Sequence, residues 1–225
     1  MITTITAGMI KAFEECPAKF DLIYNQHVEI PSNDEFAEKG KKLHALINYS
    51  LKKSDITKML TVLDKPENAD LKALWDNFTA LGIEDCEESE FTFYTPLTET
   101  IRLTGRTDAI RKTENGYEIL DWKTGKSSNI DAETNWQTIM YLYGIFSLFK
   151  HSKKIKHCKD LSMTYFFLSE NLQKTVNLDE KSYAEYGQKL TEICTKIENS
   201  NKIYPANTKK CGKCAFNIEC KGTYK

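Results

Sequence analysis

The chain has 225 residues and a formal net charge of −1, with 31 Lys and Arg against 32 Asp and Glu. A hydrophobic share of 40% permits a buried core, and the balanced charge excludes a protein that holds nucleic acid through overall basicity. No run approaches the roughly 20 apolar residues that span a bilayer, and the N-terminal stretch lacks the features of a secretion signal. We therefore expect a cytoplasmic protein, away from membranes, whose seven cysteines are free, metal-bound or catalytic.

The N-terminal part of the chain is predicted to be helical. Residues 6–24 have a helical pattern that is interrupted at Cys16–Pro17, because proline suits the first turn of a new helix. Residues 34–53 form the next predicted helix, and residues 55–81 form two short ones. One apolar stripe is expected along the helix at 34–53, made of Phe36, Gly40, Leu43, His44, Ile47 and Leu51.

In the middle of the chain the apolar pattern changes to the alternation of strands. Residues 89–95 and 101–110 alternate, and Asn115–Gly116 is a strong hairpin signal that makes 117–123 the partner strand. The remaining predicted elements are, in chain order, an apolar helix at 132–150, strands at 160–169 and 172–178, a helix at 179–200 and an irregular tail at 201–225.

This order of elements predicts an α/β fold with a central mixed sheet flanked by helices. We expect a single domain over 1–225. Within it, residues 1–85 form a mainly helical segment, residues 86–180 form the sheet core, and residues 181–225 form a C-terminal helix and a tail rich in cysteine.

The strand after the hairpin ends in ILDWKTGK, which places Asp121 and Lys123 on the same face of the sheet. If residues 115–116 form a two-residue turn, Asp108 lies opposite Lys123. All three charged side chains then share one face, provided that the register does not slip by one residue.

Two carboxylates that meet at one point repel each other, and Mg²⁺ or Mn²⁺ would neutralise them because hard divalent ions prefer oxygen ligands. A neighbouring lysine can hold an attacking water or stabilise charge on a phosphate. Such a set suits metal-assisted cleavage of a phosphodiester. The alternative is an ordinary surface ion pair between Asp121 and Lys123, and geometry alone leaves both interpretations open.

Four short motifs follow one another along residues 40–145. They are Gly40 and His44 as G-x-x-x-H, GRTDAI at 105–110, ILDWKTGK at 119–126 and QTIMY at 137–141. In this order they resemble the RecB-like branch of the PD-(D/E)XK nucleases. The resemblance implies a restriction-endonuclease-like fold and a metal-dependent nuclease.

The resemblance also implies roles for individual residues. The metal ligands would be His44, Asp108, Asp121 and the carbonyl of Trp122. Lys123 would position the attacking water, and Gln137 and Tyr141 would contact DNA or steady the lysine. Taken alone, His44 and Tyr141 would be interpreted as packed core residues.

Three cysteines of the tail, Cys211, Cys214 and Cys220, are one thiolate short of a four-ligand site, and Cys16 is the candidate fourth. One cysteine before the nuclease motifs and three after them resemble the iron–sulfur subset of the family, which includes the AddB nuclease domain and the CRISPR-adaptation nucleases. This implies a [4Fe–4S] cluster that ties the chain ends together. Zn²⁺ on the same ligands and free thiols are the alternatives. The cysteines without such spacing are Cys86, Cys158 and Cys194.

We therefore expect a deoxyribonuclease, and specifically an exonuclease that acts on DNA ends or single strands. CRISPR adaptation and phage or mobile-element recombination and repair are both open as pathways. Their candidate partners are a CRISPR integrase and a single-strand annealing protein, respectively. The alternative function is a non-catalytic DNA-binding scaffold within a larger nuclease complex.

Overall fold

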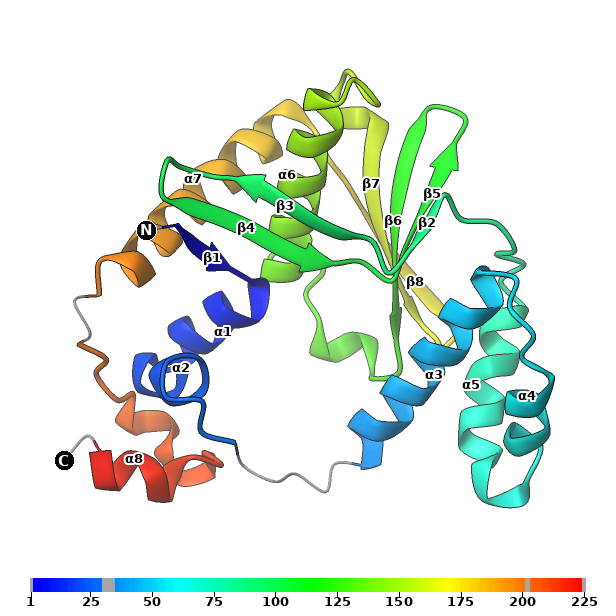
Figure 1. Ribbon diagram of the computed structural model, residues 1–225, viewed down its shortest axis with the longest axis horizontal. Coiled ribbons are helices and arrows are strands. Elements are labelled where there is room, and N and C mark those ends of the chain that lie inside the picture. Colours follow the sequence, from blue (N-terminus) through cyan, green and yellow to red (C-terminus); the bar gives the residue numbers. More distant parts are fainter. Residues whose placement is uncertain (1, 30–34, 201–202, 224–225) are drawn as a thin grey trace.

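A computed structural model describes residues 2–29, 35–200 and 203–223 (Figure 1). Strands form a three-stranded sheet of order β1-β4-β3 and a five-stranded sheet of order β2-β5-β6-β7-β8. The strands are β1 (Thr3–Ile5), β2 (Glu88–Ser89), β3 (Thr92–Pro96), β4 (Ile101–Arg106), β5 (Ala109–Thr113), β6 (Gly116–Lys123), β7 (Leu161–Phe167) and β8 (Leu172–Asn177). The predicted mixed α/β architecture is confirmed.

The helices are α1 (Ala7–Glu15), α2 (Pro17–Tyr24), α3 (Glu35–Leu51), α4 (Thr57–Leu63), α5 (Ala69–Thr79), α6 (Trp136–His151), α7 (Glu180–Glu198) and α8 (Asn217–Thr223). Helices α1 to α7 begin and end close to their predicted positions, whereas α8 lies in the tail that was predicted to be irregular. Pro17 opens α2 as expected, because its missing N–H costs nothing in a first helical turn. Asn135 caps α6, since its side chain accepts a hydrogen bond from the Gln137 N–H.

Helices cover the five-stranded sheet on both faces (Figure 1). On one face α1, α6 and α7 pack over the larger hydrophobic cluster, and the apolar helix α6 lies at its centre. On the other face α3 and α5 pack over a smaller cluster that includes Trp75, Phe78 and Trp122. The central strand β6 is therefore buried on both sides, which explains its nearly continuous run of buried residues.

The strands predicted at 89–95 and 101–110 form a single antiparallel ribbon with a sharp bend. Ser89 lies opposite Ala109, and Thr92 lies opposite Arg106, so the register continues through the bend and sets Glu90 opposite Asp108. One arm of the ribbon joins the five-stranded sheet and the other joins the three-stranded sheet. The prediction of unbroken strands was wrong at this bend, where Glu90 has a φ of 52°.

The predicted hairpin register was also wrong, although the predicted shared face survives. Thr113 pairs with Gly116 and Ala109 pairs with Leu120, so the turn contains residues 114–115 rather than 115–116. This differs from the prediction by two residues. Because side chains alternate with a period of two, a slip of two keeps every side chain on its face.

Two further differences concern the N-terminal half. Strand β1 was not predicted; it pairs in parallel with β4. Phe36 was predicted on the apolar stripe of α3 but is 82% exposed, whereas Leu43, Ile47 and Leu51 are buried. None of the helices that the structure describes is long and apolar enough to cross a membrane.

Candidate active site

The bend of the ribbon and the end of β6 bring together the two predicted acids and the lysine. Asp108 lies at the bend between β4 and β5. Asp121 and Lys123 lie near the end of β6, and both point to the face covered by α6. Trp122, between them, points to the opposite face and packs against Phe78 at a centroid distance of 5.2 Å.

Asp121 is the most buried charged group of this set, with 2% of its surface exposed. Its Oδ1 lies 2.6 Å from Nζ of Lys123, and its Oδ2 accepts a hydrogen bond of 2.5 Å from Nε2 of Gln137. Burial, together with the charge of Asp108, raises the pKa of Asp121 to about 6, although the nearby Lys123 lowers it. The site therefore holds a carboxylate that needs additional positive charge.

Gln137 connects the acid and the base. Its Nε2 donates to Asp121, while its Oε1 accepts a hydrogen bond of 3.0 Å from Nζ of Lys123. The cap of α6 fixes its backbone, because the Gln137 N–H donates to Oδ1 of Asn135 at 2.8 Å. The helix start thus sets the position of the amide, and the amide sets the orientation of both charged side chains.

His44 and Asp108 form the other half of the site. Nδ1 of His44 lies 3.0 Å from Oδ1 of Asp108, and Oδ2 of Asp108 accepts a hydrogen bond of 2.8 Å from the Trp122 N–H. Burial lowers the pKa of His44, but the hydrogen bond and charge of Asp108 outweigh it, so the net pKa is raised. The histidine therefore points into the site and not into the core.

The carbonyl of Trp122 points toward Asp108. The N–H and C=O of one strand residue point to the same neighbouring strand. The Trp122 N–H donates to Asp108, and β5 ends at Ala109, so this carbonyl lies beyond the last pair of the ladder. The next carbonyl, that of Lys123, faces the other way and accepts from the N–H of Leu168.

Tyr141 supports the backbone of the site. Its hydroxyl donates a hydrogen bond of 2.8 Å to the carbonyl oxygen of Arg106, two residues before Asp108. Burial raises the pKa of Tyr141 to about 12, so the hydroxyl keeps its proton. Gly105 makes this contact possible, because a Cβ there would lie 2.5 Å from Cε1 of Tyr141.

The structure adds three residues that sequence reasoning did not place in the site. Nδ2 of Asn48, one turn after His44 on α3, donates a hydrogen bond of 2.9 Å to Oε2 of Glu90. Oε1 of Glu90 lies 3.6 Å from Nη1 of Arg106. The spacing of Asn48 from His44 is a helical signal that could have found it. Glu90 is brought to the site by the bend in the ribbon, which the sequence pattern does not predict.

The donor atoms of the site fit a hard divalent cation. Oδ1 of Asp121 is buried, and its close polar contact in the described part of the chain is the ion pair of 2.6 Å with Nζ of Lys123. Carboxylate, imidazole and carbonyl donors suit Mg²⁺ or Mn²⁺. Within the described ranges, however, no three His, Cys, Asp or Glu side chains are already gathered closely enough to form a metal site. The ligands would have to move together on binding.

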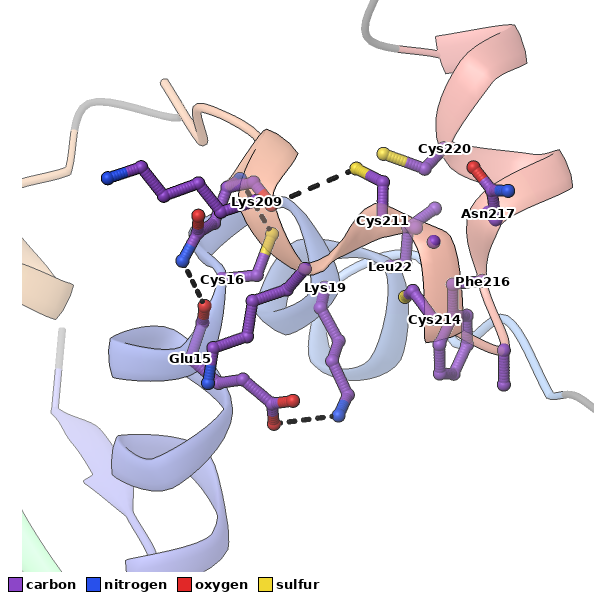
Figure 2. Close-up of a pocket in the computed structure, with 14 residues that line it drawn as sticks. Glu15, Cys16, Lys19, Leu22, Lys209, Cys211, Cys214, Phe216, Asn217 and Cys220 are labelled. Carbon is purple, nitrogen blue, oxygen red and sulfur yellow. Dashed lines mark hydrogen bonds and ion pairs between the residues drawn. The ribbon is translucent and has the colours of Figure 1, made fainter.

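The four predicted cluster cysteines line one cavity of about 670 Å³ between α2 and the tail (Figure 2). The Cys211 thiol donates a hydrogen bond of 3.8 Å to the carbonyl oxygen of Asn207, drawn as a dashed line in Figure 2. Burial raises the pKa of the Cys220 thiol, and the charges of the other three cysteines raise it further. The donor set suits a [4Fe–4S] cluster, and Lys19, Lys209 and Lys210 on the cavity wall would offset its negative charge. These described sulfur atoms, like the acids, do not yet form a closed metal site.

Comparison with known proteins supports a nuclease. A family model described as the PD-(D/E)XK nuclease superfamily matches residues 4–221. No curated protein matches the chain. Among solved structures 27 chains match. One of them, named "Crystal structure of SSO0001", has 15% sequence identity and a TM-score of 0.45 over 100% of this chain and 89% of its own.

Proposed function

The chain belongs to the PD-(D/E)XK nuclease superfamily, and we propose that it is a metal-dependent DNA nuclease of the RecB-like branch. One observation supports the proposal most directly. The side-chain amide of Gln137 is hydrogen-bonded to both Asp121 and Lys123, and Asp108 lies beside this group. A surface ion pair would need neither a buried acid nor a third residue that orients both charges.

We assign the metal to His44, Asp108, Asp121 and the Trp122 carbonyl. When bound, Mg²⁺ or Mn²⁺ would neutralise the carboxylates and polarise the phosphodiester and an attacking water. The ammonium of Lys123, held by Gln137, lies where it can orient that water or balance charge on the phosphate. His44 holds Asp108 through one oxygen while the Trp122 N–H holds the other, so the carboxylate is fixed before substrate arrives.

The test is cleavage of labelled DNA with Mg²⁺ or Mn²⁺. We expect Asp108→Asn and Lys123→Ala each to lower the rate at least about 100-fold, because the first removes a charged ligand of the metal and the second removes the ammonium group beside the reacting phosphate. Lys112→Ala is the matched control, since Lys112 is an exposed lysine near the tip of the β5–β6 hairpin. The proposal is wrong if either site variant, folded as judged by its melting temperature, cleaves at the rate of the control.

We further propose that the four cysteines Cys16, Cys211, Cys214 and Cys220 hold a [4Fe–4S] cluster. Their shared cavity and the lysines around it support this assignment. Zn²⁺ on the same ligands is the alternative. Because the tail is held to α2 by few other contacts, the cluster would act mainly as a structural clamp between the two ends of the chain.

For the reaction itself we propose an exonuclease on DNA ends or single strands, acting in CRISPR adaptation or in phage or mobile-element recombination and repair. A CRISPR integrase and a single-strand annealing protein are the corresponding partners. A non-catalytic DNA-binding scaffold is the competing function. The intact set of acids, lysine and glutamine favours catalysis, because a scaffold would have no need to keep a buried carboxylate against its desolvation cost.

A further inference from the structure

A second cavity adjoins the candidate active site. It has a volume of about 850 Å³ and opens beside Lys123, Gln137 and Tyr141. The first turns of α1, strand β4 and the start of α6 form its walls, together with the loop before α6. A volume of this size is typical of sites that bind a small ligand or a single building block of a polymer. Any substrate that reaches Lys123 from this side must cross the cavity.

Besides Lys123, the cationic side chains that line the cavity are Arg106 and Lys11, which come from different elements. Arg106, on β4, is 65% exposed, and its backbone and guanidinium are held by Tyr141 and Glu90, respectively. Lys11, on α1, is exposed. Guanidinium and ammonium groups that line a groove are typical contacts for phosphate.

The two carboxylates on the cavity wall are engaged in hydrogen bonds of their own. Oε2 of Glu14 accepts a hydrogen bond of 2.5 Å from Nε1 of Trp136. Oδ1 of Asp131 accepts from the N–H of Glu133 at 3.2 Å. Both are thereby partly satisfied, which leaves Arg106 and Lys11 as the charges with most to gain from a bound anion.

Trp136 provides an aromatic surface in the same cavity. It is the first residue of α6, directly before Gln137, and it is half-buried against the larger hydrophobic cluster. Its hydrogen bond to Glu14 fixes the polar edge of the indole. An indole held in this way, on the wall of a groove with cationic side chains, is the combination that binds single-stranded nucleic acid by stacking.

We propose that this cavity is a subsite for one unpaired nucleotide next to the cleaved phosphate, with its base on Trp136 and its phosphate between Arg106 and Lys11. The inference rests on the proposed nuclease function and names the substrate at that site as single-stranded DNA. Stacking on the indole replaces stacking on a neighbouring base, so the subsite favours a base that has left the duplex.

The test of the base contact is a binding cycle with labelled single-stranded oligonucleotides in EDTA, where no cleavage occurs. Trp136→Ala should weaken binding about 5- to 150-fold, the range for loss of one stacked base. One abasic site is then moved along the oligonucleotide. With the abasic site at one particular position, the DNA should bind wild-type protein and Trp136→Ala equally. Trp136→Phe should restore most of the affinity for intact DNA.

The test of the phosphate contacts is the dependence of binding on salt. Arg106→Ala and Lys11→Ala should each weaken binding and lower the slope of log affinity against log salt by about 0.7, the value for one phosphate contact on single strands. Lys189→Ala is the control, because Lys189 is exposed on α7 and lines a neighbouring hollow but not this cavity. Its slope should not change.

These measurements separate the subsite from the chemistry. If the protein cleaves DNA but Trp136→Ala loses the same affinity for abasic DNA at every position, the subsite is refuted and the nuclease remains. If no DNA is cleaved but the cycle shows one position that depends on Trp136, the subsite stands and the nuclease proposal fails. Unchanged salt slopes in both cationic variants would remove the phosphate contacts.

Discussion

The buried negative charge of Asp121 lowers the stability of the metal-free protein. The pKa of an unfolded Asp is about 3.9, and burial, which outweighs the nearby Lys123, raises that of Asp121 to about 6. The folded chain therefore holds this proton more tightly than the unfolded chain. The stability that protonated Asp121 contributes is complete below about pH 4 and is lost as the pH rises through 6.

Asp121→Asn should therefore stabilise the metal-free protein at pH 7.5 while it abolishes cleavage. We expect a gain of about 2–3 kcal/mol in the free energy of unfolding, measured by urea in EDTA. The gain should disappear as the pH falls toward 4. Mg²⁺ should raise the melting temperature of the wild type but not that of the variant, since a ligand stabilises only the fold that binds it. A destabilised variant at pH 7.5 would contradict this account.

At the residue scale, sequence reasoning predicted the residues of each motif but not the residues that support them. His44, Asp108, Asp121 and Lys123 meet because their motifs lie on elements whose pairing the sequence indicates. Asn48, Glu90 and Arg106 were not predicted, since their contacts depend on a bend in the ribbon. Ser89 and Asp108 flank that bend, but position 90 carries glutamate, although its positive φ is one that glycine or asparagine would more often supply.

Gly116 illustrates, at the scale of an element, why a correct hairpin signal led to the wrong register. The Asn-Gly pair suggested a turn centred on both residues, but Gly116 is the first residue of β6. A Cβ on Gly116 would lie 2.0 Å from the carbonyl oxygen of Asp160. The glycine is needed for a close approach of the chain before β7, a tertiary contact that short-range pattern cannot report.

Gly116→Ala should consequently destabilise the fold by about 1–3 kcal/mol, because the backbone at Asp160 has to move to admit the methyl group. Urea unfolding of the two proteins measures the difference. Gly125→Ala, where the structure leaves open space for a Cβ, is the matched control and should change stability much less. Equal stability of both variants would show that the β6–β7 start can relax freely.

The whole molecule has two well-packed layers and one weakly packed end. The larger cluster joins residues from Ile5 to Ile197, whereas among the described residues α8 adds none to either cluster. Apart from the ring of Tyr204, whose centroid lies 5.8 Å from that of Phe20, the tail meets the N-terminal helices through a few polar contacts. The Asn207 N–H donates to Sγ of Cys16 at 3.2 Å, its Nδ2 donates to the Glu15 carbonyl at 3.0 Å, and the Ala18 N–H donates to Pro205.

A tail with so little apolar burial needs another source of order, and the proposed cluster supplies one. Cys214→Ser should remove the visible absorption of anaerobically purified protein and its iron, expected near four atoms per chain for one [4Fe–4S] cluster. Hydrogen exchange should then accelerate across residues 203–220 while the amides of β6 and α6 stay protected, because the sheet and its helices have their own core.

Cys86→Ser is the matched control. Cys86 is half-buried against the smaller hydrophobic cluster and is not one of the residues that line the four-cysteine cavity. The variant should keep both the iron and the slow exchange of the tail. The wild-type protein could instead contain zinc, with a tail that is protected from exchange in wild type but not in Cys214→Ser. The four cysteines would then form a zinc site and not an iron–sulfur cluster. Equal exchange in wild type and Cys214→Ser would mean that the tail is ordered without the proposed cluster.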